Sequence, residues 1–175
     1  MQEIGLFIGR FQPLHKGHML AMRDCVRRAN LLIVAIGSPQ ESGTYKNPFM
    51  LAERKEMVNK VMKGIGAEKY KIIELPDTAT DAEWVELVKK QAGKFDMAWS
   101  GNDLVIKIFK AAGLPVKRID EYPGVSATKI RRRICTGEPW LKFIPLSVRQ
   151  YLKEIKAAQR IRKLCLRGLL PNALS

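Results

Sequence analysis

The sequence is poor in histidine and cysteine and has no long apolar run, and each shortage excludes a class of protein. Only two histidines and three cysteines occur among 175 residues. The cysteines, Cys25, Cys135 and Cys165, lack the spacing of zinc ligands, so no protein-built metal site is expected. Unpaired thiols favour a reducing compartment, and we expect a cytoplasmic protein. No apolar stretch approaches the roughly 18 residues of a membrane span, and no secretory signal is recognisable.

Two widespread phosphate-binding motifs are also missing. Neither G-x-x-x-x-G-K-[ST] nor G-x-G-x-x-G occurs, and there is no internal repeat or domain linker. Acidic residues are few: 17 Asp and Glu against 31 Lys and Arg give a formal net charge of +14. That charge implies anionic partners, whether nucleotides, nucleic acid or an acidic surface, without choosing among them. The length and the 46% hydrophobic content predict one domain, residues 1–175, with a proper core.

Short apolar runs alternate with amphipathic segments along most of the chain. Helices are expected between the runs, one of them starting with Asn47 as N-cap and Pro48 as first helical residue, and another spanning residues 81–95. Strands alternating with helices predict an α/β fold, a doubly wound parallel sheet of about five strands. The expected strands are residues 4–8, 31–37, 71–75, 97–99 and 115–119.

Residues 136–175 predict a basic C-terminal helical extension. Basic amphipathic helices can bind membranes or nucleic acid, but we favour packing on the sheet or on a neighbouring subunit. One apolar stripe at helical spacing supports this interpretation, formed by Val148, Leu152, Ile155, Ala158, Ile161 and Cys165.

Both histidines fall in residues 9–18, GRFQPLHKGH, a turn between the first strand and the following helix. Open α/β sheets bind their ligands at such turns. His15 and His18 share one face of the first helical turn, where free N–H groups and the helix dipole favour phosphate. Arg10 adds a planar fork for phosphate oxygens, and Gly9 permits a ligand to approach the backbone.

Ser126 predicts a second anion-binding helix start. Its hydroxyl suits an N-cap, Thr128 adds another hydroxyl, and Arg131 can reach back over bound phosphates. Taken alone, this segment is more typical of a capped helix that has a basic solvated face. Trp84 similarly suits either the core or stacking on a flat cationic ring.

These segments together resemble a known family. The stretch GRFQP followed by HKGH is similar to the H-x-G-H signature of the nucleotidyltransferase superfamily, and Ser126-x-Thr128-x-x-Arg131 resembles its second signature, which grips the ATP phosphates. Residues 46–49, KNPF, with Glu53 and Arg54 resemble a further segment, in which Met50 stands where threonine is common. Over essentially the whole chain, the pattern is similar to archaeal-type nicotinamide-nucleotide adenylyltransferases.

The resemblance implies a Rossmann-like enzyme that transfers AMP from ATP to nicotinamide mononucleotide (NMN), giving NAD and pyrophosphate. It implies direct in-line attack, with Mg²⁺ bound mainly through the ATP phosphates, and a homo-oligomer without nucleic-acid or membrane partners. The implied catalytic residues are His15, His18, Arg10 and Arg131; those for ATP are Gly9, Phe11, Lys46, Ser126 and Thr128; those for NMN are Asp77, Asp81, Trp84 and Asn102.

Alternative functions stay open at this point. Asp81 stands where related sequences tend to carry asparagine, which leaves room for the acid form of the mononucleotide. Another phosphorylated acceptor is possible, such as phosphopantetheine or flavin mononucleotide, as is cytidylyl transfer. A non-catalytic nucleotide- or nucleic-acid-binding module is the third possibility, but such a module would not need both histidines.

Overall fold

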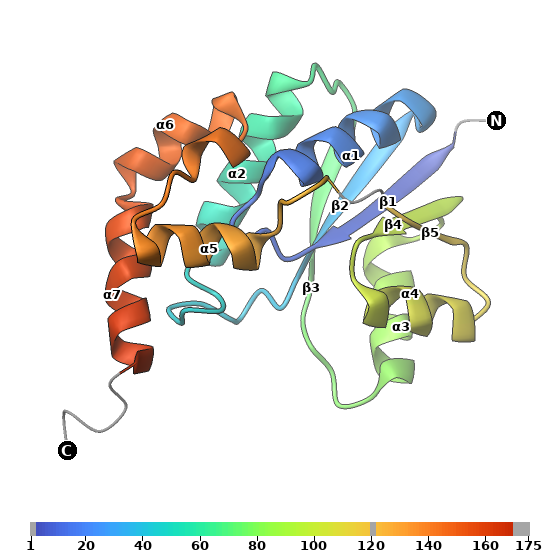
Figure 1. The fold of residues 1–175 in the computed structure, drawn as a ribbon. Coiled ribbons are helices and arrows are strands. Elements are labelled where there is room, and N and C mark those ends of the chain that lie inside the picture. The colour runs from blue at the N-terminus through green and yellow to red at the C-terminus, as the bar shows by residue number, and fades with distance from the viewer. Residues whose placement is uncertain (1–2, 120–121, 170–175) are drawn as a thin grey trace.

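The structure is a computed structural model that describes residues 3–119 and 122–169. A five-stranded sheet in the order β3-β2-β1-β4-β5, all pairs parallel, lies at its centre (Figure 1). This confirms the predicted doubly wound α/β fold. The strands are β1 Ile4–Gly9, β2 Leu31–Gly37, β3 Tyr70–Leu75, β4 Met97–Ser100 and β5 Val116–Arg118.

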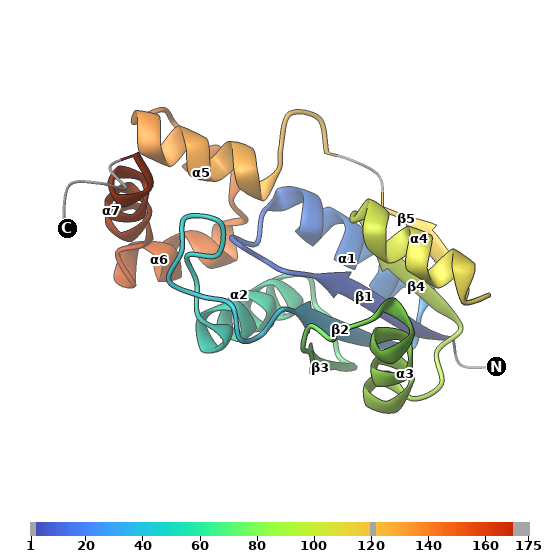
Figure 2. The same cartoon turned by 90° about the horizontal axis from the view of Figure 1, so that it is seen from below.

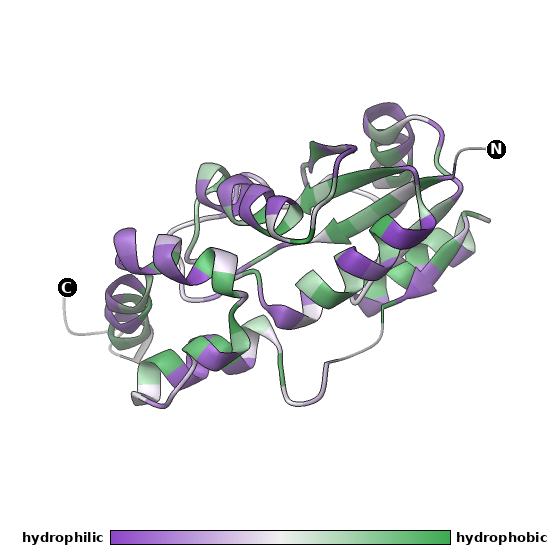
Figure 3. Cartoon of the chain, turned by 90° about the horizontal axis from the view of Figure 1, so that it is seen from above, coloured by the Kyte–Doolittle hydropathy of each residue, from purple (hydrophilic) through white to green (hydrophobic). Residues whose placement is uncertain are grey.

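Helices cover both faces of the sheet (Figure 2). Because side chains of a strand alternate between faces, Phe7 of β1 enters the core cluster with α1 and α2, whereas Leu6 and Ile8 enter the cluster with α3 and α4. Figure 3 shows the result, hydrophobic strands inside helices that are hydrophilic on their outer sides. The helices are α1 Lys16–Arg28, α2 Leu51–Gly64, α3 Asp81–Ala92, α4 Asp103–Ala111, α5 Ala127–Thr136, the 3₁₀ turn η1 Leu141–Phe143, α6 Leu146–Glu154 and α7 Ala157–Leu169.

The strand order creates one topological switch point. From β1 the chain builds outward through β2 to β3, and then crosses to β4 on the other side of β1. The connections at the carboxyl ends of β1 and β4 therefore lead to opposite faces of the sheet. Crevices at such points are where open α/β sheets bind ligands.

The predicted helix start at Asn47 and Pro48 is wrong. Helix α2 begins at Leu51, with Met50 as its N-cap. The residues before it are held extended because the Gln12 side chain pairs with both backbone polar groups of Phe49: Gln12 Nε2 donates to the Phe49 carbonyl at 3.0 Å, and the Phe49 N–H donates to Gln12 Oε1 at 2.9 Å. This long-range pairing overrides the local N-cap and proline signal.

Helix α3 is also shorter than residues 81–95. It ends at Ala92, since Gly93 turns the chain with a φ of 71°.

The C-terminal extension is helical as predicted, but it consists of two helices. Lys156, with a φ of 53°, separates α6 from α7. The apolar stripe continues across the break: Val148, Leu152 and Ile161 are buried in the same core cluster as residues of α2 and α5. The stripe is therefore covered within the chain. None of the helices described is long and apolar enough to cross a membrane.

Replacing Ile161 by alanine should lower the free energy of unfolding by about 2–4 kcal/mol, because it removes a fully buried side chain and leaves a cavity. Leu166 lies on the same helix and is 61% exposed, so Leu166→Ala should change it by less than about 0.5 kcal/mol. Urea unfolding of both variants measures the difference. Equal effects would show that α7 is not packed on the domain in solution.

Candidate functional site

A cavity of about 900 Å³ opens at the carboxyl ends of the strands. Its walls come from the ends of β1, β2 and β4 and from the N-terminal ends of α1, α3, α4 and α5. Every residue that the sequence analysis assigns to the site lines this cavity, although the residues come from segments far apart in the chain. Lining residues that the sequence analysis missed include Ser38, Leu104, Ile119 and Tyr122.

The two histidines stack on each other at the start of α1. His15 is the N-cap, and its ring centroid lies 3.7 Å from that of His18, with 24° between the planes. The His15 backbone N–H donates to His18 Nδ1 at 3.3 Å. Because Nδ1 accepts, a neutral His18 carries its proton on Nε2, where it can be donated to a ligand. A Cβ on Gly17 would lie 3.1 Å from the His15 ring, which explains why glycine follows in this motif.

Both histidines are neutral at pH 7 in the ligand-free protein. Burial lowers the pKa of His15 from 6.5 to about 4. Burial, together with the adjacent His15, lowers the pKa of His18 well below 6.5. Among the residues that the structure describes, His15 Nδ1 is buried without a hydrogen-bond partner. Such a pair is ready to interact with an anion, whose charge would offset the cost of burying a protonated ring.

The Phe11 ring packs against the histidine pair. Its backbone has a φ of 55°, and its buried ring meets the His18 ring edge-on, with centroids 5.1 Å apart. A Cβ on Gly9 would lie 2.8 Å from the Phe11 ring. Phe11 therefore occupies the space that a side chain at position 9 would need; Gly9 also lines the cavity, and the approach of a ligand to its backbone stays a prediction.

Helix α5 presents its N-terminus to the same cavity. Ser126 is its N-cap as predicted, and its hydroxyl accepts from the Lys129 N–H at 3.2 Å. Arg131 is buried: Nη1 donates to the Gln12 carbonyl at 2.7 Å, and Nη2 donates to Thr128 Oγ1 at 3.2 Å. Arg131 thus joins α5 to the histidine turn as well as lining the cavity, a structural role that the sequence did not reveal.

Arg54 fixes the floor of the cavity. It is fully buried and donates to backbone carbonyls at the ends of two strands. Nη1 donates to Gly37 at 2.9 Å and to Arg10 at 3.3 Å, and Nη2 to Ser38 at 3.0 Å and Pro39 at 3.1 Å. The signal in the sequence was the Glu53-Arg54 pair, which the resemblance had singled out without a role.

The opposite wall of the cavity is aromatic. Trp84 on α3 is half-buried and packs edge-on against Phe109, with ring centroids 6.0 Å apart. It also lines the cavity, so it serves the core and the site together. Asp81, the first residue of α3, is exposed at the same edge.

Asp77 and Asn102 are partly engaged within the protein. Asp77 accepts from the Ser38 hydroxyl at 2.9 Å and from Gln40 Nε2 at 2.8 Å. Asn102 caps α4 through its side-chain oxygen, which accepts from the Leu104 N–H at 2.9 Å. Its amide hydrogens remain as donors.

The part of the cavity predicted to bind phosphate, at the histidine turn and the start of α5, is basic. Arg10 and Lys46 are exposed and line the cavity, as does the exposed Lys129 of α5. Over the described ranges, no group of three His, Cys, Asp or Glu residues is placed to hold a metal ion.

Comparison with known proteins agrees with this geometry. Residues 6–133 match the cytidylyltransferase-like family. The nicotinamide-nucleotide adenylyltransferase of Pyrococcus horikoshii is 43% identical over 163 residues, covering 91% of this chain and 88% of that protein. The enzyme of the same name from Saccharolobus solfataricus is 37% identical over 164 residues, covering 91% and 95%.

A solved structure shares the fold. The bifunctional NMN adenylyltransferase/ADP-ribose pyrophosphatase of Francisella tularensis, in complex with AMP and a manganese ion, has a TM-score of 0.74 at 23% identity. The match covers 96% of this chain and 53% of that protein, so the chain spans about half its length. From the family match and the extent of these identities, the chain belongs to the cytidylyltransferase-like family, among the archaeal-type nicotinamide-nucleotide adenylyltransferases.

Proposed function

We propose that this chain transfers AMP from ATP to nicotinamide mononucleotide, giving NAD and pyrophosphate. The observation that carries the proposal is the joining of a histidine pair with basic groups and a half-buried tryptophan in one cavity. Relatives that share about 40% of its residues over most of their length are adenylyltransferases of this kind.

Catalysis in this site is positioning and charge stabilisation. A phosphate oxygen of the mononucleotide attacks the α-phosphorus of ATP, and the bond from that phosphorus to the bridging oxygen of the β-phosphate breaks. The attacking phosphate is already an anion, so no protein nucleophile or general base is needed. His18 Nε2 and His15 donate to oxygens whose negative charge grows during the transfer. Arg10, Lys46 and the start of α5 hold the phosphates that leave as pyrophosphate.

Magnesium fits this site as part of the ATP complex. The groups around the phosphate-binding end are cationic side chains and backbone N–H groups, whereas Mg²⁺ prefers oxygen ligands. The phosphate oxygens of ATP supply such ligands. The ion would neutralise part of the polyphosphate charge, and the residues of the site would position the complex of ATP with magnesium.

The acceptor binds toward α3 in this proposal. Trp84 offers an aromatic face for the pyridinium ring, and Asp77, Asp81 and Asn102 line the same cavity as candidate contacts for the mononucleotide. A homo-oligomer, the cytoplasmic location and the lack of nucleic-acid partners stay predictions.

One assay tests the function directly. ATP is incubated with NMN, nicotinic acid mononucleotide, flavin mononucleotide and phosphopantetheine, and pyrophosphate and the adenylylated product are measured. We expect product with a pyridine mononucleotide. Product with flavin mononucleotide or phosphopantetheine alone would contradict the proposed acceptor.

Replacing His18 or His15 by alanine should lower kcat by about a hundredfold or more, by analogy with the loss of one preorganised donor. Interactions that strengthen only in the transition state affect kcat, so ATP affinity measured by calorimetry should change much less. Arg10→Ala should weaken ATP binding as well. Near-normal turnover of His18→Ala with only a raised KM for ATP would reduce the histidines to phosphate anchors.

Trp84→Ala should raise the KM for the mononucleotide by about ten- to a hundredfold, since stacking on an aromatic ring stabilises a base by roughly 1–3 kcal/mol. The KM for ATP should change little, and Trp84→Phe, which keeps a flat ring, should retain part of the affinity. Steady-state kinetics with each substrate varied in turn gives the comparison. Equal losses for both substrates with a lowered Tm would mark Trp84 as a core residue only.

The two histidines should make stability fall in acid. Because their pKa is lowered in the folded chain, the unfolded chain binds more protons between pH 6.5 and about 4, and the free energy of unfolding falls as the pH drops through that window. Bound pyrophosphate should raise both pKa values and reduce the fall. Proton NMR of the two imidazoles, assigned with His15→Asn and His18→Asn, measures the pKa values. Values near 6.5 in the free protein would contradict this.

A further inference from the structure

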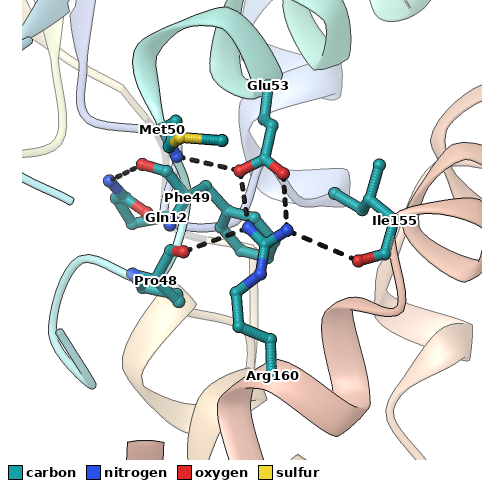
Figure 4. A network of polar contacts seen from close by, with 7 residues as sticks. All are labelled: Gln12, Pro48, Phe49, Met50, Glu53, Ile155 and Arg160. Atoms are coloured by element: carbon teal, nitrogen blue, oxygen red, sulfur yellow. Dashed lines mark hydrogen bonds and ion pairs between the residues drawn. The ribbon is translucent and has the colours of Figure 1, made fainter. Parts of the chain in front are cut away.

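Arg160 on α7 reaches from the C-terminal extension to the start of α2. Its guanidinium holds the Glu53 carboxylate at two points, Nη1 to Oε2 at 2.6 Å and Nη2 to Oε1 at 2.7 Å (Figure 4). Nη1 also donates to the Pro48 carbonyl at 3.3 Å, and the group lies 5.8 Å from the centre of the Phe49 ring. The Glu53 side chain is 9% exposed, so the planar guanidinium of Arg160 holds a carboxylate that is largely shielded from water.

Residues 47–50, which we call the anchor segment, lie between Arg160 and the histidine turn. On the side of the turn, the Gln12 side chain holds Phe49 by two hydrogen bonds. Glu53 adds a third contact, because its Oε2 accepts from the Met50 N–H at 2.9 Å. The segment is therefore held from both sides, by Gln12 within the site and by Arg160 and Glu53 outside it (Figure 4).

The anchor segment also fixes the backbone that carries Lys46. The Thr44 N–H donates to the Asn47 carbonyl at 3.2 Å, and the Asn47 N–H donates to Thr44 Oγ1 at 3.0 Å, which closes a turn around Lys46. Lys46 is exposed and lines the cavity. A displacement of the anchor segment would move the origin of this side chain relative to bound phosphates.

We propose that Arg160 is a positioning residue for the ATP phosphates. Through its contacts with Glu53 and Pro48 it holds the anchor segment against Gln12, and this fixes the backbone from which Lys46 extends into the cavity. Among the described residues that line the cavity, Arg160 is not found, so its effect passes through the anchor segment. The inference rests on the proposed function, in which Lys46 contacts the ATP phosphates.

The first experiment compares Arg160→Lys and Arg160→Met with the unchanged enzyme. Lysine keeps a positive charge beside the buried Glu53 but cannot hold it at two points, so this variant should fold. Each variant should raise the KM for ATP, Arg160→Met by about tenfold and Arg160→Lys by less, as expected for coupled neighbours. The KM for NMN should be unchanged and kcat should stay within about threefold. An unchanged KM for ATP in both variants would overturn the inference.

Ile161→Ala is the matched control, because it changes the next residue of α7 and removes a buried side chain of the core. It should lower the Tm while leaving the KM for ATP unchanged. A rise in KM equal to that of Arg160→Met would show that general loosening of α7, and not the hold on the anchor segment, explains the effect. That result would also overturn the inference.

A double-mutant cycle tests the route through Lys46. ATP affinity is measured by calorimetry for Arg160→Lys, Lys46→Ala and the double variant. In the Lys46→Ala background, Arg160→Lys should change the Kd for ATP by less than about twofold. Fully additive losses would contradict positioning through Lys46. The cycle needs ATP alone, so it remains decisive if the unchanged protein binds ATP but fails to adenylylate NMN, a result that would refute the proposed function separately.

Discussion

The site depends on one buried guanidinium, that of Arg54. Parallel strands end with carbonyl groups that have no partner in the sheet, and Arg54 collects these groups from the ends of β1 and β2 by four hydrogen bonds. Among the described residues, no carboxylate forms an ion pair with it, so carbonyl dipoles stabilise the charge. Burial and the nearby Arg10 lower the pKa of this guanidinium, yet an arginine remains charged at pH 7. The backbone of Arg10, Gly37 and Ser38, residues that line the cavity, is thus cross-linked by a buried positive charge.

The packing of the histidine pair has two opposing effects. Packing against Phe11 and against each other keeps the rings fixed, and the same packing removes the water that would solvate a protonated ring. The pair is consequently neutral in the free protein and, in the proposed function, its interaction with phosphate would strengthen as charge accumulates on the oxygens. A site that is preorganised in this way requires little reorganisation at the moment of transfer. Because the buried histidines have lowered pKa values, the free energy of unfolding should also depend on pH.

The sequence predicted those features that local chemistry decides. Alternating apolar runs gave the sheet, and the hydroxyl of Ser126 gave the start of α5. The wrong end of α3 has a local cause in Gly93, but the wrong start of α2 results from a contact between distant residues. Asn47 and Pro48 carry a strong local signal for a helix start, but Gln12, far away in the chain, holds the neighbouring Phe49 extended. The structural roles of Arg54, Arg131 and Arg160 escaped detection for the same reason, since their partners are backbone carbonyls or distant side chains that no local pattern reveals.

The charged residues of the chain have different roles in different parts of the fold. Within the described parts of the chain, ion pairs engage basic residues such as Lys55, Arg118 and Arg160 away from the phosphate-binding end, and they include neither Arg10 nor Lys46. Many acidic residues are used as caps and cross-links: Glu53 holds Arg160 and the start of α2, and Glu83 caps α3. Arg10 and Lys46 thus have no ion pair among the described residues and, in the proposed function, are available to the phosphates of ATP. The net charge of +14 alone did not distinguish nucleotides from nucleic acid, whereas a cavity that Arg10 and Lys46 line together with the histidine pair fits a nucleotide.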